Sequence, residues 1–167
     1  MQPPRYSLME IERRWLVPAP SPAELATLPC RVIEDTYLDG TRLRLRSIRA
    51  PDGTVIHKLG KKYGRAGASS QPITNIYLSP EEYQVFCALP GARVVKQRYA
   101  VERGAIDLYP SPLSLAVFEI EFASEQEAAD YAPPEFVGEE ITGQEAYSGA
   151  ALAARYAAGM QAFRHGA

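Results

Sequence analysis

Charged residues of one sign recur at every second position in four separate stretches of the chain. The acidic stretches are Glu10-Ile11-Glu12 and Glu119-Ile120-Glu121, and the basic stretches are Arg42-Leu43-Arg44-Leu45-Arg46 and Lys96-Gln97-Arg98. Because a β-strand sends alternate side chains to opposite faces, each set is expected to share one face of a strand. Paired carboxylates are the hard oxygen ligands that Mg²⁺ or Mn²⁺ prefers, and arginine forks match phosphate oxygens. The spacing therefore favours a site for a phosphorylated anion with a divalent cation.

A charged face with period two is, in a single strand, most often an ordinary solvent-facing side. Here four strands show it at once, with acids on the first and last and bases on those between them. Surfaces usually intersperse charges of both signs, whereas these blocks are unmixed. We therefore interpret the segregated faces as the lining of a functional site. Arg14 shares the face of Glu10 and Glu12, while Lys58 and Asp107 add one charge each.

The same patterning places these residues on eight predicted strands. The strands cover residues 8–17, 31–38, 41–49, 54–59, 73–78, 92–102, 105–109 and 114–123. Pro51-Asp52-Gly53 is typical of a hairpin turn between two of them. The segment from Leu59 to Pro72 is rich in Gly, Ser and Lys, shows no period, and predicts a mobile loop. Its basic residues Lys61, Lys62 and Arg65 are expected to form either a lid or a solvated surface.

Helices are predicted by capping patterns and composition. Ser21, Ser79 and Ser124 each have a glutamate three residues later, so that serine and glutamate can cap the first turn together. The resulting helices are expected from 21 to 28, from 79 to 89 and after 124. An alanine-rich fourth helix is expected from about residue 145 to residue 163.

Eight short strands joined mostly by hairpins favour an antiparallel sheet that closes on itself, since exposed edges would need covering. We predict a single domain over residues 1–167 that is mainly β with flanking helices (α+β). Its architecture is expected to be an eight-stranded antiparallel closed tunnel barrel with a C-terminal helix.

Turned inward, the charged faces would place guanidinium and ammonium groups opposite carboxylates. Unpaired buried charge is costly, and a polyanion with its cations would neutralise it. Phosphoryl transfer needs this neutralisation, a metal ion and an oriented nucleophile. The residues therefore fit a metal-dependent triphosphatase whose partner is a small-molecule triphosphate.

The ordered set of motifs resembles the CYTH superfamily, also called the triphosphate tunnel metalloenzymes. The set runs from Glu10-Ile11-Glu12-Arg13-Arg14 through the arginine-rich strand, Lys58 and Lys96-Gln97-Arg98 to Glu119-Ile120-Glu121. Tyr37-Leu38 and residues 138–143 extend the resemblance over most of the chain, to about Leu152. It implies an eight-stranded tunnel that binds triphosphate compounds with Mg²⁺ or Mn²⁺.

The resemblance also implies roles for individual residues. Metal ligation falls to Glu10, Glu12, Glu119 and Glu121, with Asp107 as a further candidate that is equally expected to be a rim carboxylate. Phosphate binding falls to Arg44, Arg46, Lys58, Lys96 and Arg98, with Arg42 ranked after them. Arg14 and Lys96 are the residues expected to assist the reaction itself.

Three positions depart from the superfamily pattern. Arg14 stands where the superfamily usually has lysine, and arginine can donate hydrogen bonds but cannot be deprotonated to help activate water. Asn75 and Tyr77 stand where many relatives have glutamates. We expect these changes to affect turnover and substrate preference while leaving the charged core intact.

Bulk properties exclude several other classes. The 167 residues include 18 basic and 20 acidic ones, and this balance favours neither nucleic acid nor a membrane surface as partner. No apolar run approaches the roughly 18 residues of a membrane span. Cys30 and Cys87 lack the spacing of a metal site. A cytoplasmic monomer or homodimer is expected.

Three functions remain open at this point. The first is hydrolysis of inorganic tripolyphosphate by a metal-oriented water that attacks a terminal phosphorus. The second is an adenylyl cyclase of the same fold, which would need a pocket for the base. The third is a polyphosphate- or nucleotide-binding module without turnover.

Overall fold

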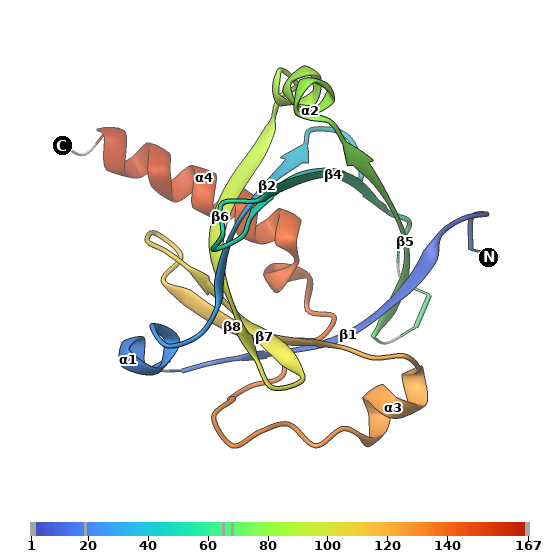
Figure 1. The fold of residues 1–167 in the computed structure, drawn as a ribbon, viewed down its shortest axis with the longest axis vertical. Helices are drawn as coiled ribbons and strands as arrows, with labels where there is room; N and C mark the ends of the chain where they lie inside the picture. Colours follow the sequence, from blue (N-terminus) through green and yellow to red (C-terminus); the bar gives the residue numbers. More distant parts are fainter. Residues whose placement is uncertain (1–2, 19, 65, 68, 166–167) are drawn as a thin grey trace.

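The fold is an eight-stranded barrel in a computed structural model that describes residues 3–18, 20–64, 66–67 and 69–165. The strands close in the order β1-β5-β4-β3-β2-β6-β7-β8, and every neighbouring pair is antiparallel. They are β1 (Leu8–Leu16), β2 (Cys30–Leu38), β3 (Leu43–Arg49), β4 (Val55–Lys62), β5 (Ser70–Leu78), β6 (Gly91–Val101), β7 (Gly104–Tyr109) and β8 (Leu115–Glu121). Figure 1 looks through this ring of strands. The predicted fold class is confirmed.

Four short helical segments and one long helix flank the barrel among the described residues. They are α1 (Pro22–Leu25), α2 (Pro80–Cys87), α3 (Glu125–Asp130), the 3-10 helix η1 (Glu145–Tyr147) and the long α4 (Gly149–His165). The side chains of Ser21, Ser79 and Ser124 each accept a hydrogen bond from the backbone amide three residues later, as the capping patterns predict. None of the helices described has the length and apolar content needed to cross a membrane.

The prediction of a loop from Leu59 to Pro72 is wrong at both ends. β4 continues to Lys62 and β5 begins at Ser70, so only the residues between them form a connection. The apolar alternation that marks a strand is missing here because the lumen-facing positions are Gly60 and Lys62. A Cβ on Gly60 would lie 2.7 Å from Asn75 Oδ1, so glycine lets β4 and β5 carry large side chains beside it. Arg65 lies outside the described residues.

The predicted helix from residue 145 is interrupted. η1 ends at Tyr147, Ser148 adopts an extended conformation, and α4 begins only at Gly149. A Cβ on Gly149 would collide with the hydroxyl of Tyr37, which lies directly against the first turn of α4. The break therefore brings the start of α4 against lumen-facing residues of the barrel.

The apolar core lies in two places because the barrel interior is largely charged. One cluster is built on the outer face of the sheet around Trp15 and Phe118, whose ring centroids are 5.8 Å apart. The other joins Val94 and Val117, which share the faces of Lys96 and Glu119, to Leu152 and Ala153 of α4. This second cluster packs α4 across the barrel, behind the ring in Figure 1.

Candidate functional site

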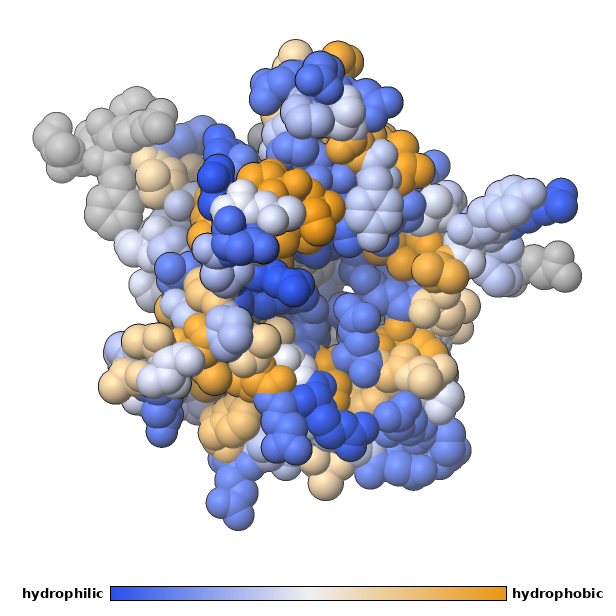
Figure 2. Space-filling model, viewed as in Figure 1, coloured by the Kyte–Doolittle hydropathy of each residue, from blue (hydrophilic) through white to orange (hydrophobic). Residues whose placement is uncertain are grey.

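A charged cavity of about 550 Å³ occupies the barrel. Hydrophilic residues surround the central hollow in Figure 2. Its lining includes most of the predicted site residues: Glu10, Glu12, Arg14, Arg42, Arg44, Arg46, Lys96, Arg98, Glu119 and Glu121. The prediction that these faces turn inward is therefore confirmed.

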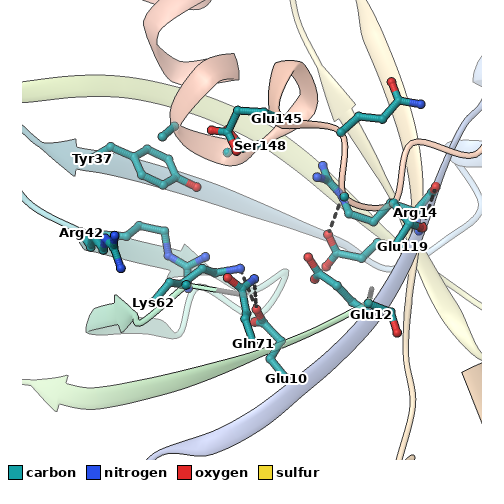
Figure 3. Close-up of a pocket in the computed structure, with 18 of the residues that line it drawn as sticks. Glu10, Glu12, Arg14, Tyr37, Arg42, Lys62, Gln71, Glu119, Glu145 and Ser148 are labelled. Carbon is teal, nitrogen blue, oxygen red and sulfur yellow. Dashed lines mark hydrogen bonds and ion pairs between the residues drawn. The ribbon is translucent and has the colours of Figure 1, made fainter. Parts of the chain in front are cut away.

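The carboxylates come from two neighbouring strands. β1 pairs with β8 so that Glu12 lies opposite Glu121 and Arg14 lies opposite Glu119. Directly paired residues of an antiparallel sheet point to the same side, so all four side chains project from one wall. Figure 3 shows Glu12 and Glu119 side by side on this wall.

Glu12 is an acid of the cavity whose pKa is raised. Burial, together with the nearby charges of Glu119 and Glu10, raises its pKa to about 7, although Lys62 and Arg14 act in the opposite direction. Within the described residues no cation lies within 4 Å of its carboxylate, so it has no ion pair. Ionising this group is therefore less favourable than ionising an exposed glutamate.

Two further half-buried glutamates of the cavity are held by cations. The Oε2 atom of Glu10 accepts hydrogen bonds from Lys62 Nζ at 2.6 Å and from Gln71 Nε2 at 3.0 Å. Glu119 Oε1 accepts from Arg98 Nη2 at 2.7 Å. Burial alone would raise the pKa of Glu119, but the positive charges around it, Arg98 foremost, hold that pKa far below its usual value.

Arg14 links the carboxylate wall to the segment before α4. Its Nη1 donates to the backbone oxygen of Tyr147 at 2.8 Å, and its Nε lies 3.5 Å from Glu119 Oε2. Figure 3 shows this arginine reaching from β1 toward η1 beside Glu119. Part of its donor capacity is therefore committed within the protein.

The basic wall is built from β3 and β6. Arg46 donates from Nε and Nη2 to the two oxygens of Asp35, at 2.6 and 2.7 Å, and Arg44 Nε lies 3.8 Å from the same carboxylate. Lys96 and Arg98 instead donate to Asp107, at distances between 2.5 and 2.7 Å. Each group of cations thus has its own aspartate.

Two predicted site residues do not line the cavity. Asp107 is fully buried, and both of its oxygens accept hydrogen bonds from Lys96 or Arg98. Lys58 pairs with Arg46 across β3 and β4 and so faces inward, but its Nζ lies 4.9 Å from the ring centroid of Tyr77. Asp107 therefore contacts the cations from behind, and the Lys58 ammonium lies over the Tyr77 ring.

Comparison with known proteins identifies relatives of this barrel. An inorganic triphosphatase of Nitrosomonas europaea is 33% identical over 154 residues, which cover 87% of this chain and 97% of the relative. The chain belongs to the family of that inorganic triphosphatase. A solved crystal structure of an inorganic triphosphatase superimposes with a TM-score of 0.53 at 26% identity, covering 86% of this chain and 93% of the other. A solved hypothetical protein gives the same TM-score at 27% identity, with 86% and 97% covered. No protein-family profile matches the chain.

In this member of the inorganic triphosphatase family, sequence reasoning missed several cavity residues. Lys62, which the predicted loop includes, lines the cavity, and its parity with Lys58 is the signal that indicates this place. Tyr37 and Tyr109 also line the cavity, as does the segment from Glu145 to Ala150 in part. Burial raises the pKa of both tyrosines, so that they stay protonated and can donate hydrogen bonds.

The donor chemistry of the triphosphatase cavity suits a divalent cation. Among the described residues, no three His, Cys, Asp or Glu side chains already stand close enough to hold a metal ion. Glu10 and Glu119 are engaged by Lys62 and Arg98 instead. Carboxylates are nevertheless the preferred ligands of Mg²⁺ and Mn²⁺, and a cation would offset the burial and the negative charges of Glu119 and Glu10 that raise the pKa of Glu12.

Proposed function

We propose that this protein hydrolyses inorganic tripolyphosphate with a divalent metal ion, Mg²⁺ or Mn²⁺, as a triphosphate tunnel metalloenzyme of the CYTH superfamily. The observation that carries the proposal is the placement of Glu12, which has no ion pair among the described residues, beside Glu119 in one cavity with the cations of β3 and β6. The relation to the N. europaea inorganic triphosphatase supports the same activity.

The cations of the cavity are suited to bind the triphosphate. We assign this role to Arg42, Arg44, Arg46, Lys62, Lys96 and Arg98. Arginine forks can each engage two phosphate oxygens, whereas the lysines act as point charges. Lys58 is not assigned to phosphate binding, because its ammonium lies over the ring of Tyr77.

Charge balance indicates why a metal ion would favour binding of the anion and its hydrolysis. The cavity lining has seven cationic side chains and five glutamates, Glu145 included, and Asp35 and Asp107 lie against those cations. The apoprotein is therefore close to neutral here, and a highly charged triphosphate would leave the lumen strongly negative. Glu10, Glu12, Glu119 and Glu121 would hold Mg²⁺ or Mn²⁺, which supplies charge neutralisation and activates water.

The reaction joins a water oxygen to a terminal phosphorus and breaks its bond to the bridging oxygen, giving orthophosphate and pyrophosphate. The guanidinium and ammonium groups hold the substrate in line for attack and stabilise the charge that develops on its oxygens. Arg14 remains protonated throughout, holds the η1 segment through its hydrogen bond to Tyr147 and lies in ion-pair contact with Glu119.

Phosphate release from tripolyphosphate, ATP and thiamine triphosphate tests this proposal. Each is assayed with Mg²⁺, Mn²⁺ or EDTA, and melting curves are recorded on the same samples. We expect metal-dependent release that is fastest with tripolyphosphate and is lost in Glu12→Gln. A large rise in melting temperature with ligand and metal, without phosphate release, would instead identify a binding module.

A further inference from the structure

Two buried aspartates stand behind the phosphate-binding cations, one on β2 between the basic strands β3 and β6 and the other on β7 beside β6. Asp35 of β2 is 3% exposed and Asp107 of β7 is fully buried. Both project toward the lumen, since Asp35 pairs with Arg46 and Asp107 pairs with Arg98 across neighbouring strands. Neither lines the cavity. They therefore touch the cations without being placed to touch a triphosphate.

Each aspartate occupies one edge of a guanidinium. Asp35 accepts from Nε and Nη2 of Arg46, and Asp107 accepts from the same two atoms of Arg98. Among the described residues, Nη1 of neither arginine has a hydrogen bond. Because a bidentate pair fixes the plane of the guanidinium, the aspartate also fixes the direction of the remaining donors.

The two aspartates are connected differently to the carboxylate wall. Arg98 Nη2 donates to Asp107 Oδ2 and also to Glu119 Oε1, both at 2.7 Å. Asp107 is thereby one arginine away from Glu119. Arg46 has no such bridge, since all its ion pairs among the described residues are with Asp35.

We propose that Asp35 and Asp107 are positioning residues that orient the phosphate-binding cations, and that only Asp107 also sets the availability of Glu119. The proposal rests on the proposed function, because it assigns these arginines to the triphosphate. It replaces the expectation that Asp107 ligates metal with a role through Arg98 and Lys96.

Replacing Asp35 by asparagine distinguishes a positioning role from simple charge neutralisation, because the two roles predict opposite changes in the affinity for the triphosphate. Removing a negative charge would by itself strengthen binding of an anion. Loss of the bidentate pair would weaken binding of the anion. The expected loss is about 10- to 100-fold, the size seen when a residue that holds a metal ligand in place is removed. Asp35→Glu keeps the charge and changes the geometry, so positioning predicts weaker binding there too.

Calorimetric titration of inorganic tripolyphosphate in EDTA measures this affinity without turnover. The matched control is Glu34→Gln, which removes one charge from the next position of β2, where Glu34 pairs with Arg93 on the other face. We expect Kd to rise at least about tenfold in Asp35→Asn and Asp35→Glu and to stay unchanged in Glu34→Gln. An unchanged or lower Kd in Asp35→Asn would overturn the proposal. So would failure of both Asp35 variants to melt cooperatively, since that would assign Asp35 to folding.

Binding of Mn²⁺ alone, followed by electron paramagnetic resonance, tests the difference between the two aspartates. In Asp107→Asn, Arg98 loses one carboxylate and pairs more fully with Glu119, so Mn²⁺ affinity should fall several-fold. Asp35→Asn should leave Mn²⁺ affinity unchanged, and equal effects in both variants would contradict the proposed link. Wild-type protein that binds tripolyphosphate but releases no phosphate would refute the proposed function while leaving this inference intact.

Discussion

Glu12→Gln should stabilise the metal-free protein while abolishing its metal-dependent activity. The folded state raises the pKa of Glu12 from 4.5 to about 7, through burial and the neighbouring charges of Glu119 and Glu10. Each pH unit of such a difference corresponds to about 1.4 kcal/mol, so ionised Glu12 costs the folded apoprotein about 3 kcal/mol at pH 8. A neutral glutamine of the same shape avoids this cost.

The effect has a defined pH dependence. Below about pH 4.5 the Glu12 carboxyl is protonated in both the folded and the unfolded chain, and the variant should match the wild type. Between about 4.5 and 7 the folded state binds more protons than the unfolded state, so wild-type stability falls as pH rises. Above about pH 7 the difference in stability between the variant and the wild type no longer changes with pH.

Melting curves in EDTA at pH 5 and pH 8 measure this difference. For a chain of this size, about 3 kcal/mol corresponds to a rise in melting temperature of about 6 to 12 °C at pH 8, with a much smaller rise at pH 5. Saturating Mg²⁺ or Mn²⁺ should stabilise the wild type and leave the variant largely unaffected. A variant that melts below the wild type at pH 8, or a difference independent of pH, would refute the electrostatic account of Glu12.

Three further predictions concern neighbouring residues. Glu119→Gln should destabilise the apoprotein by about 2 kcal/mol, the opposite sign to Glu12→Gln, because it removes a charged hydrogen-bond partner of Arg98, which keeps only Asp107, and the carboxylate beside Arg14; melting in EDTA at pH 8 checks the sign, and a stabilised variant contradicts it. Arg44→Ala should raise the tripolyphosphate Kd by about tenfold or more with little change in kcat, as calorimetry and steady-state rates would show; a loss confined to kcat would place Arg44 in the reaction step instead. Gly149→Ala should destabilise the fold by about 1–3 kcal/mol because its Cβ collides with Tyr37, and an unchanged melting temperature would show that the contact relaxes freely.

Much of the site could be predicted because strand parity is a local property. Glu10, Glu12, Arg44 and Arg46 face the lumen as their spacing indicates. Their sign segregation also predicted which strands would carry acids and which bases. Strand parity alone therefore predicts which face of the sheet lines the cavity.

The depth of each charge could not be predicted, because it depends on contacts between distant strands. Asp107 and Glu119 are both carboxylates at lumen-facing strand positions. Asp107 is nevertheless buried against Lys96 and Arg98, while Glu119 lines the cavity. The sequence did not single out Asp35, because no other acid stands two positions before or after it on β2. The hydrogen bond of Arg14 to Tyr147, 133 residues away, likewise lies beyond local patterns.

The pairing of β1 with β8 has a consequence for how the protein acquires its site. The first half of β1 pairs with β5 and the second half with β8, so the N-terminal strand completes the ring. During synthesis Glu12 leaves the ribosome early but meets Glu121 only after almost the whole barrel sequence has followed. Such distant pairing is slow to form. The nascent chain therefore cannot complete the proposed metal site until its last strand docks, and a shortened chain ending before β8 should neither retain a metal ion nor sequester triphosphate.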